Sequence, residues 1–460
     1  MKRLFIYLVV LLLPVMHVFA VENVLFVSTD GTGDGSSWVN ASSFTAAAEV
    51  ARVQEVKPEI WVKAGTYIFS APVNFDDLFI YGGFSGDETA LNDRNWATNL
   101  TIFDGNDASS ILRNTVGAAR LPNGNATVIP CLLDGVIVQN GLSPTNANGG
   151  GMIINNGAVI RNCVFRNNAT QGTDIHGAAI HCNTNTIVIE NSLFVNNTSI
   201  GNGGAIQIGG ATSVTIRSCT FANNKALYPG GAIGFGNNTS NLTLYNTIVY
   251  NNLYGTEYNS FGSKTTISGG GVVISNHSAV ESTSTKFTND ENDVDHLLFD
   301  RGATVPIVPG FVAPATVIGK GANETEITEI NNASYRITKT SPCLDAGLNS
   351  EATVETIPYD LDHTSRIFAD YVDMGAYECI YEPDNIFEYP SDAHFKTSIV
   401  DNELRVSGAL MGEKVQLYDV QGKMLNSRVI NSDNEIAKFR LSYKGIYLVS
   451  VQNKVIKVNY

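Results

Sequence analysis

Residues 132–252 decide the fold, because one short pattern returns in them five times. The copies are Val136-Ile137-Val138-Gln139-Asn140, Val164-Phe165-Arg166-Asn167-Asn168, Leu193-Phe194-Val195-Asn196-Asn197, Thr220-Phe221-Ala222-Asn223-Asn224 and Ile248-Val249-Tyr250-Asn251-Asn252. Aligned on Ile137, Phe165, Phe194, Phe221 and Val249, they follow one another at nearly constant spacing. A constant period of roughly 20 to 50 residues indicates stacked supersecondary units, so the chain is predicted to be a solenoid.

A Gly-rich element also returns once per period, at residues 150–153, 177–180, 203–206 and 230–233. The rest of each period holds short β-branched runs, such as Thr186-Ile187-Val188-Ile189, and nothing long enough for an amphipathic helix. The period therefore predicts a right-handed parallel β-helix, in which each strand pairs with its copy about 4.8 Å away in the next coil.

The repeated Phe and Asn residues have distinct expected roles. Phe165, Phe194 and Phe221 are expected to point inward and stack on one another. Asn suits the sharp bends, since it tolerates the left-handed backbone conformation that a bend requires. Aligned amides are also expected to hydrogen-bond along the axis, as in cross-strand ladders; they are Asn140, Asn168, Asn197, Asn224 and Asn252.

These motifs resemble a known family. Gly-Gly-Ala-Ile at 203–206 and 230–233, with Phe-x-x-Asn at 165–168, 194–197 and 221–224, is similar to the paired repeats of the polymorphic outer-membrane-protein family. That family consists of β-helical surface proteins of Gram-negative bacteria, several of them adhesins. The resemblance implies a fold more strongly than an activity.

Composition excludes one class of partner. The 460 residues, 43% of them hydrophobic, provide for a large core and two folded domains. Acidic residues outnumber basic ones by 44 to 29, which argues against nucleic acid as a partner, because a nucleic-acid-binding surface is basic. Low charge content (16%) with 42 glycines is typical of an extracellular β-solenoid.

The N-terminus carries an export signal. Lys2-Arg3 precede an apolar run from Leu4 to Val15, and Val18-Phe19-Ala20 fits a cleavage site between Ala20 and Val21. The alternative is a membrane anchor, but the run is short and is interrupted by Pro14 and His17. Residues 1–20 are therefore predicted to be a signal peptide, with no transmembrane helix in the mature chain.

Six cysteines in an exported chain raise the question of disulfides. Cys163 and Cys219 occupy the same slot two coils apart, about 9.6 Å by the coil spacing, which is too far to bridge. Cys343 and Cys379 flank one segment and are candidates for a disulfide. The sequence leaves Cys131 and Cys182 undecided.

Residues 21–60 are predicted to cap the start of the column. Phe44, Ala47, Ala48 and Ala51 have helical spacing, which indicates a short amphipathic helix over the open end. Further on, Glu88 and Arg94 are expected to form an exposed ion pair.

Two later segments are candidates for ligand binding. After Asn252 the period lengthens, and the inserted part contains Tyr254, Tyr258 and Phe261, which either stack on sugar rings or fold back over the column. Asp290, Asp293 and Asp295 lie in the most acidic stretch, which is either a calcium site or an exposed loop. No other cofactor is predicted.

The β-helix, residues 61–379, is predicted to end in a closing segment at 335–379. Ser341-Pro342-Cys343-Leu344-Asp345-Ala346-Gly347, Asp360-Leu361-Asp362 and Val372-Asp373-Met374-Gly375-Ala376-Tyr377-Glu378 resemble the choice-of-anchor Q domain, although His363 replaces the usual glycine. Its carboxylates either accept hydrogen bonds from turn amides and pair with Arg366, which we favour, or form a catalytic set.

Residues 380–396 are predicted to be a linker and residues 397–460 a small antiparallel β-sandwich. Leu417-Tyr418-Asp419-Val420-Gln421-Gly422-Lys423 and Lys444-Gly445-Ile446-Tyr447 resemble the C-terminal sorting domain of type IX secretion cargo. The resemblance implies the type IX secretion machinery as a partner and attachment at the outer-membrane surface.

Three functions are compatible with the sequence. The favoured one is a non-catalytic adhesin or glycan-binding protein, with a polysaccharide or a host surface as ligand. The alternative is a polysaccharide lyase or glycoside hydrolase, which requires clustered carboxylates or a base. The candidates for such chemistry are Asp174, His176 and His181, although a histidine on a strand face is more often structural. The third compatible function is that of a structural spacer.

Overall fold

The structure is a computed structural model. It describes residues 23–114, 131–145, 147–183, 185–210, 212–236, 240–255, 257–258, 273–280, 297–298, 308–352, 357–368, 371–380, 395–400, 403–419, 423–432, 434–441, 446–452 and 454–459. The chain forms two compact units, Met1–Cys379 and Ile380–Tyr460. Within the described residues, no helix has both the length and the apolar character that crossing a bilayer requires.

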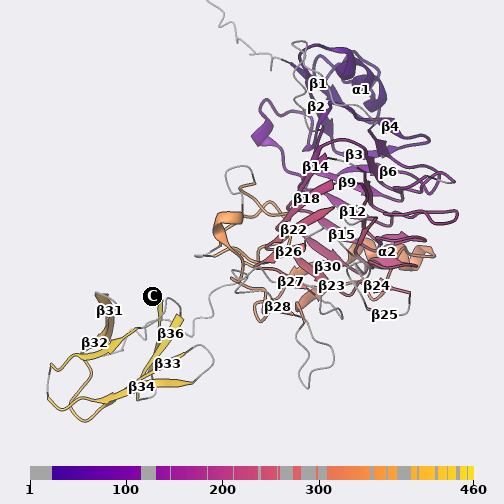
Figure 1. Cartoon of the computed structure of the whole chain (residues 1–460). Helices are drawn as coiled ribbons and strands as arrows, with labels where there is room; N and C mark the ends of the chain where they lie inside the picture. Colours follow the sequence, from indigo (N-terminus) through magenta and orange to yellow (C-terminus); the bar gives the residue numbers. More distant parts are fainter. Residues whose placement is uncertain are drawn as a thin grey trace, which may run out of the picture. The chain divides into compact units, whose positions relative to one another are not determined.

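The first unit is built on three long parallel sheets that run along one column (Figure 1). Sheet A consists, in order, of β1 (Val24–Val27), β2 (Glu59–Lys63), β5 (Phe79–Phe84), β8 (Cys131–Asp134), β11 (Ala158–Arg161), β14 (Asn185–Glu190), β18 (Thr212–Arg217), β22 (Asn241–Tyr245) and β26 (Val273–Asn276). Sheet B consists of β3 (Gly65–Ile68), β6 (Thr101–Asp104), β9 (Val136–Gln139), β12 (Val164–Arg166), β15 (Leu193–Val195), β19 (Thr220–Ala222), β23 (Ile248–Tyr250), β27 (Ala279–Val280) and β28 (Leu297–Leu298).

Sheet C completes six of the described coils and consists of β4 (Val73–Asn74), β7 (Leu112–Arg113), β10 (Met152–Ile154), β13 (Ile180–Cys182), β17 (Ile206–Ile208) and β21 (Ile233–Phe235). A short sheet D lies between sheets B and C and contains β16 (Thr198–Ser199), β20 (Lys225–Ala226), β24 (Leu253–Tyr254) and the antiparallel β25 (Glu257–Tyr258). Because each strand of the three long sheets pairs in parallel with its copy one coil away, the predicted right-handed parallel β-helix is confirmed.

The interior of the column is one continuous apolar cluster, and its centre is the predicted Phe stack. The rings of Phe165 and Phe194 are parallel, with centroids 4.8 Å apart, and those of Phe194 and Phe221 are 4.6 Å apart. All three side chains are fully buried. The stacking prediction is therefore confirmed, and the column gains stability from ring contacts that cross the two boundaries between these three coils.

The register of the first repeat differs from the prediction. Val138, not Ile137, pairs with Phe165, and Val138 is the buried residue. Asn140 consequently falls one position before the ladder. The ladder itself runs through Asn168, Asn197, Asn224 and Asn252, joined by Nδ2-to-Oδ1 bonds of 3.0, 2.9 and 2.8 Å. It starts late because Gly141 occupies the first ladder slot, where its backbone N–H donates to Asn168 Oδ1.

The N-terminal end is covered by α1 (Phe44–Val53), as predicted (Figure 1). Ser43 caps the helix by accepting a hydrogen bond from the N–H of Ala46. The small buried face, with Ala47, Ala48 and Ala51 beside Phe44, lets the helix lie close to the first coil. A single-turn 3₁₀ helix, η1 (Leu91–Asp93), follows β5.

After the last described coil the chain contains β29 (Phe311–Ala313), α2 (Glu324–Asn332), β30 (Ser334–Ile337) and η2 (Asn349–Glu351). β29 and β30 pair antiparallel and add no further coil. We call the described residues of 308–379 the return segment, because their hydrogen bonds with Asn191, Asn196 and Thr220 place them along the side of the column, beside earlier coils.

The second unit consists of two antiparallel sheets that share one core. The first sheet contains β31 (Lys396–Val400), β32 (Glu403–Ser407) and β35 (Ala437–Arg440); the second contains β34 (Met424–Val429), β33 (Lys414–Asp419), β36 (Ile446–Val451) and β37 (Lys454–Asn459). Leu404 and Phe439 from one sheet pack with Val415 and Val449 from the other. The predicted small β-sandwich is thus present.

Candidate functional site

The two asparagines of each Asn-Asn bend have different roles. The second points into the column and forms the ladder, whereas the first has a left-handed backbone, with φ of +55° at Asn196 and +57° at Asn223. Asn196 Nδ2 donates to the carbonyl of Val317 at 2.6 Å, and Asn223 Nδ2 donates to that of Ala315 at 2.6 Å. The bend that turns the chain therefore also holds the return segment.

Other bonds hold the rest of the return segment on the same side. Asn191 Nδ2 donates to the carbonyl of Tyr359 at 3.0 Å, and the N–H of Ala376 donates to Thr220 Oγ1 at 3.1 Å. Gly375 has a φ of +105°, and a Cβ added there would lie 2.9 Å from Thr220 Oγ1. This position therefore requires glycine for the segment to approach the column so closely.

Between the column and the return segment lie two hollows, which share Trp96 and Asn162 as lining residues. The Tyr377 hollow has a volume of about 330 Å³ and the Tyr359 hollow about 250 Å³. We call the two together the flank groove. Binding sites for small ligands are commonly concave, ring-lined places of this size, with a few polar groups that orient the ligand.

The Tyr377 hollow is walled by rings and carries one ion pair at its rim. Trp96, Tyr335 and Tyr377 line it, with Asn162 among the polar groups. The Arg336 guanidinium makes a two-point pair with Asp362 and lies 5.1 Å from the Tyr377 ring centroid. Asp362 is thus already engaged by a cation.

Arg166 lines the same hollow, and its charge is compensated only indirectly. Arg166 Nε donates to Gln139 Oε1 at 2.9 Å, and Gln139 Nε2 in turn donates to Asp104 at 2.7 Å. Burial lowers the pKa of the Arg166 guanidinium. Among the residues that the structure describes, no carboxylate lies within ion-pair distance of Arg166.

In the Tyr359 hollow two guanidiniums share one carboxylate. Asp134 Oδ2 lies 2.8 Å from Arg94 Nη2 and 2.6 Å from Arg161 Nε, and Asp134 Oδ1 accepts from Asn162 at 2.7 Å. Arg94 is 7% exposed, so the expected exposed Glu88–Arg94 pair is wrong. The reason is local, because Glu88 instead accepts hydrogen bonds from the backbone of its own turn.

Rings from both sides close the Tyr359 hollow. His363 stacks on Tyr359 with centroids 4.2 Å apart and meets Trp96 edge-on at 4.7 Å. His363 adopts a φ of +62°, so it takes the left-handed conformation of the glycine that it replaces. Burial, with Arg94 nearby, lowers the pKa of His363 and keeps the ring neutral at physiological pH.

The flank groove is lined with aromatic rings, amides and guanidiniums. Its two carboxylates, Asp134 and Asp362, are both paired with arginines, and its histidine has a lowered pKa. Among the described residues of the chain, no three His, Cys, Asp or Glu side chains are placed to hold a metal ion together. Aromatic faces, amides and guanidiniums remain, and these are the groups that stack on sugar rings and bind their hydroxyl and acidic substituents.

The predicted catalytic candidates lie elsewhere, on sheet C and the bend before it. His181 is 5% exposed, its Nε2 is 2.6 Å from Asn183 Oδ1, and burial lowers its pKa to about 4. His176 Nδ1 accepts from the N–H of Asn202 at 2.9 Å, and its Nε2 lies 3.5 Å from the largely exposed Asp174. None of the three lines the flank groove.

Several other predicted site residues fall outside the described residues. They are Phe261, Asp290, Asp293 and Asp295, the cleavage site Ala20 and Val21, and Gly422 and Gly445 of the sorting motif. Tyr254 lies in β24, and Tyr258 lies in β25, where its backbone pairs with that of Leu253 in β24. In the second unit, the N–H of Lys423 donates to Asp419 Oδ1 at 2.8 Å, and Tyr447 belongs to the core of the sandwich.

All six cysteines are free thiols. The candidate disulfide between Cys343 and Cys379 is therefore not formed in this structure, although both side chains pack in one apolar cluster with Ile248 and Met374. Burial raises the pKa of both thiols, which keeps them protonated.

The carboxylates of the return segment have structural roles. Asp360 accepts from the N–H groups of Thr364 and Glu378, at 2.7 and 2.8 Å. Asp373 accepts from those of Asp345 and Cys379. This geometry matches the interpretation favoured from the sequence, in which the acidic residues hold turns.

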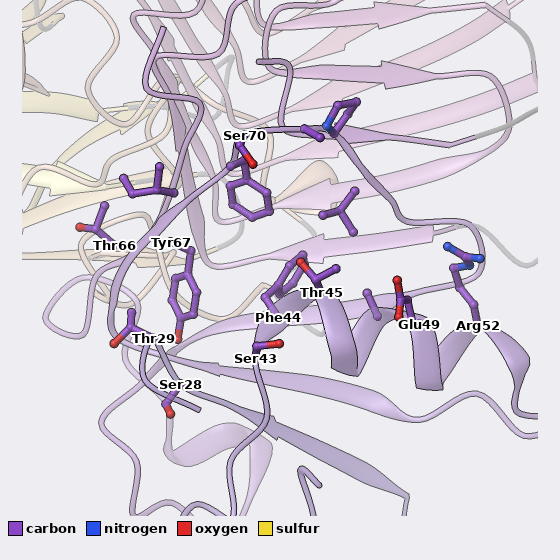
Figure 2. A pocket seen from close by; sticks show the side chains of 16 residues that line it. Ser28, Thr29, Ser43, Phe44, Thr45, Glu49, Arg52, Thr66, Tyr67 and Ser70 are labelled. Carbon is purple, nitrogen blue, oxygen red and sulfur yellow. The ribbon is translucent and has the colours of Figure 1, made fainter. Parts of the chain in front are cut away.

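A separate hollow of about 620 Å³ lies beside α1 (Figure 2). Hydroxyl groups of Thr29, Thr45 and Ser70 surround it, and Glu49 and Arg52 lie at one end, as Figure 2 shows. Its aromatic residues are largely committed to the core, since the Phe44 ring lies 4.7 Å from that of Phe103. This hollow consequently offers less ring surface to a ligand than the flank groove.

Comparison with known proteins does not identify a family for this chain. The chain matches no protein-family model and no curated protein. Among solved structures, pectate lyase Pel9A is similar at 16% sequence identity, with a TM-score of 0.36 over 78% of this chain and 96% of that chain. Nothing about activity follows from a similarity at this level. The resemblances to polymorphic outer-membrane-protein repeats, the choice-of-anchor Q domain and the type IX sorting domain remain predictions from short motifs.

The groove residues Trp96, Arg166 and Tyr359 carry no functional signal in the sequence alone. Trp96 and Arg94 lie only two positions apart, and Asp134 provides a carboxylate 38 residues after Trp96, but no periodicity connects these residues with Tyr359. The one available signal was the Tyr-rich return segment, whose path over the column is set by tertiary contacts.

Proposed function

We propose that this protein is an exported, non-catalytic β-helix that binds a glycan in the flank groove. The observation that supports this most is the groove itself, where rings, amides and guanidiniums converge while both carboxylates are already paired. Sugars are bound in proteins by stacking on rings and by hydrogen bonds from planar polar groups, so the groove provides both kinds of contact.

A glycan array probed with the full mature chain tests this proposal. Tyr359 is 38% exposed and lines the groove, whereas Tyr371 is 52% exposed and lines neither hollow. Tyr359→Ala is expected to lower the affinity for the bound glycan about tenfold, and the matched control Tyr371→Ala is expected to leave it unchanged. Equal losses in the two variants, or no bound glycan at all, would contradict the proposal.

The second candidate is a polysaccharide lyase. Arg166 favours it, because a half-buried guanidinium without a carboxylate partner, whose pKa is lowered by burial, is a candidate to assist proton abstraction from a sugar. Incubation of the full chain with polysaccharides, with and without calcium, separates the two functions. Release of unsaturated or reducing products would replace the binding proposal with the enzymatic one.

Export and attachment belong to the same proposal. The signal at residues 1–20 and the motifs around Lys423 and Tyr447 support secretion by the type IX machinery and display at the outer-membrane surface. Expression of the full chain in a bacterium that has this machinery, with and without residues 397–460, tests it by cell fractionation. Retention of the truncated chain inside the cell is expected, and equal surface display of both chains would refute this part.

A further inference from the structure

We infer that the ligand of the flank groove is an anionic glycan, whose carboxylate or sulfate groups are bound by the arginines of the two hollows. This inference rests on the proposed glycan binding and adds the chemical class of the ligand. The charge that lines the flank groove is opposite in sign to the net charge of the whole chain. The whole chain has a formal net charge of −15, yet each hollow is lined by two arginines and one aspartate.

In the Tyr377 hollow the excess cation is Arg166. Arg336 and Asp362 pair with each other, whereas Arg166 donates its Nε–H to the neutral amide of Gln139 and has no further acceptor among the residues that the structure describes. A guanidinium has five N–H donors in a planar fork that matches the two oxygens of a carboxylate. The Nη groups of Arg166 are thus suited to a two-point contact with an acidic substituent of the ligand.

In the Tyr359 hollow the carboxylate is saturated. Asp134 already accepts from Arg94, Arg161 and Asn162, so it cannot engage the full donor sets of two guanidiniums. The next carboxylate along sheet A is Glu190, which lies 3.7 Å from Arg217. Arg94 Nη1 is engaged as well, because it donates to the backbone carbonyls of Gly82 and Asp134. Arg161 donates to Asp134 through its Nε, and its Nη groups have no hydrogen-bond acceptor among the described residues, so Arg161 is the guanidinium of this hollow that can bind an acidic group.

Trp96 contributes a third unmatched donor where the hollows meet. Its side chain is 8% exposed and lines both hollows, and its Nε1–H has no acceptor among the described residues. A buried donor without an acceptor costs free energy that an entering oxygen would recover. A groove with this surplus of donors selects a ligand rich in negatively charged oxygens, and its rings select a sugar to carry them.

Titration calorimetry with the full mature chain tests the inference with polygalacturonate (carboxylated), heparin (sulfated) and dextran (neutral). We expect polygalacturonate or heparin to bind at low salt, with an affinity that falls at least tenfold between about 0.05 and 0.5 M salt, and dextran not to bind. The preferred polymer identifies the acidic group. Binding of dextran with equal affinity would overturn the anionic class but leave glycan binding intact, whereas no binding of any glycan, on this panel or on the array, would overturn both.

Two matched variants test whether Arg166 contacts the acidic group of the ligand. Arg166→Gln removes one positive charge inside the groove, and Arg113→Gln removes one at an exposed position of β7 outside it. Arg166→Gln is expected to weaken binding of the anionic polymer about tenfold. Arg113→Gln is expected to change it less than about twofold, as is usual for an exposed charge away from the site. Equal effects of the two variants, with unchanged melting temperatures, would show that only net charge matters and would overturn the inference.

Discussion

The rings of Trp96 and His363 meet edge-on with their centroids 4.7 Å apart, although Trp96 follows η1 near the start of the column and His363 belongs to the return segment. This contact shows how the flank groove is assembled. The column provides one wall, the return segment provides the other, and neither wall forms a binding site by itself. Changes that loosen the return segment are therefore expected to affect the groove without disrupting the coils.

Asn223→Ala tests the anchoring of the return segment. Its side chain donates to the carbonyls of Ala315 and Val317 and to the Tyr335 hydroxyl, so its loss removes three buried contacts between the column and the return segment. We expect the free energy of unfolding to fall by about 2–4 kcal/mol and the return segment to exchange its amide hydrogens faster. The control is Asn106→Ala, an exposed residue with a left-handed φ of +48°, which is expected to cost only about 1 kcal/mol of backbone strain.

Phe194→Ala tests the central stack. Phe194 is fully buried between two parallel rings, and its removal leaves a cavity that the stiff coils cannot close. The expected loss of unfolding free energy is about 3–5 kcal/mol by urea denaturation. Ile68→Ala, at a side chain that is 62% exposed, is expected to change it by less than about 0.5 kcal/mol. Similar losses for both would contradict the stacked core.

The buried carboxylates of the return segment predict a stability that falls as pH rises. Burial raises the pKa of Asp360 and of Asp373 to about 6, against an ordinary value of 3.8, and it also raises the pKa of Glu378. The folded state therefore holds these protons more tightly than the unfolded state does. This contribution is fully present below about pH 4 and is lost as pH rises through about 6.

Glu378→Gln separates that effect from other titrations. The neutral amide mimics the protonated carboxyl, so we expect the variant to gain stability over the wild type as pH increases from 5 to 9. Glu324→Gln changes an exposed carboxyl and is expected to track the wild type. Thermal melts across this pH range measure both, and a wild type that gains stability relative to Glu378→Gln toward alkaline pH would refute the assignment.

His181→Gln tests the structural role of this histidine. Burial lowers its pKa to about 4, so the folded state excludes a proton that the unfolded state binds below about pH 6.5. Its contribution to stability is present above about pH 6.5 and is lost as pH falls toward 4. Gln occupies the same slot at Gln207. The variant is expected to bind glycan normally and to lose less stability in acid, and loss of glycan binding alone would contradict this.

The column could be predicted well from the sequence because the pattern of apolar residues and asparagines that forms it is local and repeated. Phe165, Phe194 and Phe221 stack as the period requires, and Phe44 with its alanines forms the capping helix. The register error at Val138 arose at the one coil where Gly141 stands in the ladder slot and removes the second Asn of the pattern.

The groove could not be predicted in the same way. Its walls are joined by bonds such as Asn191 to Tyr359 and Asn223 to Ala315, which link residues far apart in a segment without a period. The partner of Arg94 is Asp134 in a later coil, not the nearby Glu88, because the loop after η1 folds against sheet A and places Arg94 beside the backbone of Gly82 and Asp134. Single-sequence patterns contain no signal for such contacts.

The most direct test of the account is a crystal structure of the full mature chain with the acidic oligosaccharide that binds most tightly in calorimetry. The account predicts that the sugar lies in the flank groove between Trp96 and Tyr359 or Tyr377, with an acidic group at the Arg166 or Arg161 guanidinium. A sugar bound beside α1 or on the outer face of another sheet, with the flank groove empty, would contradict it.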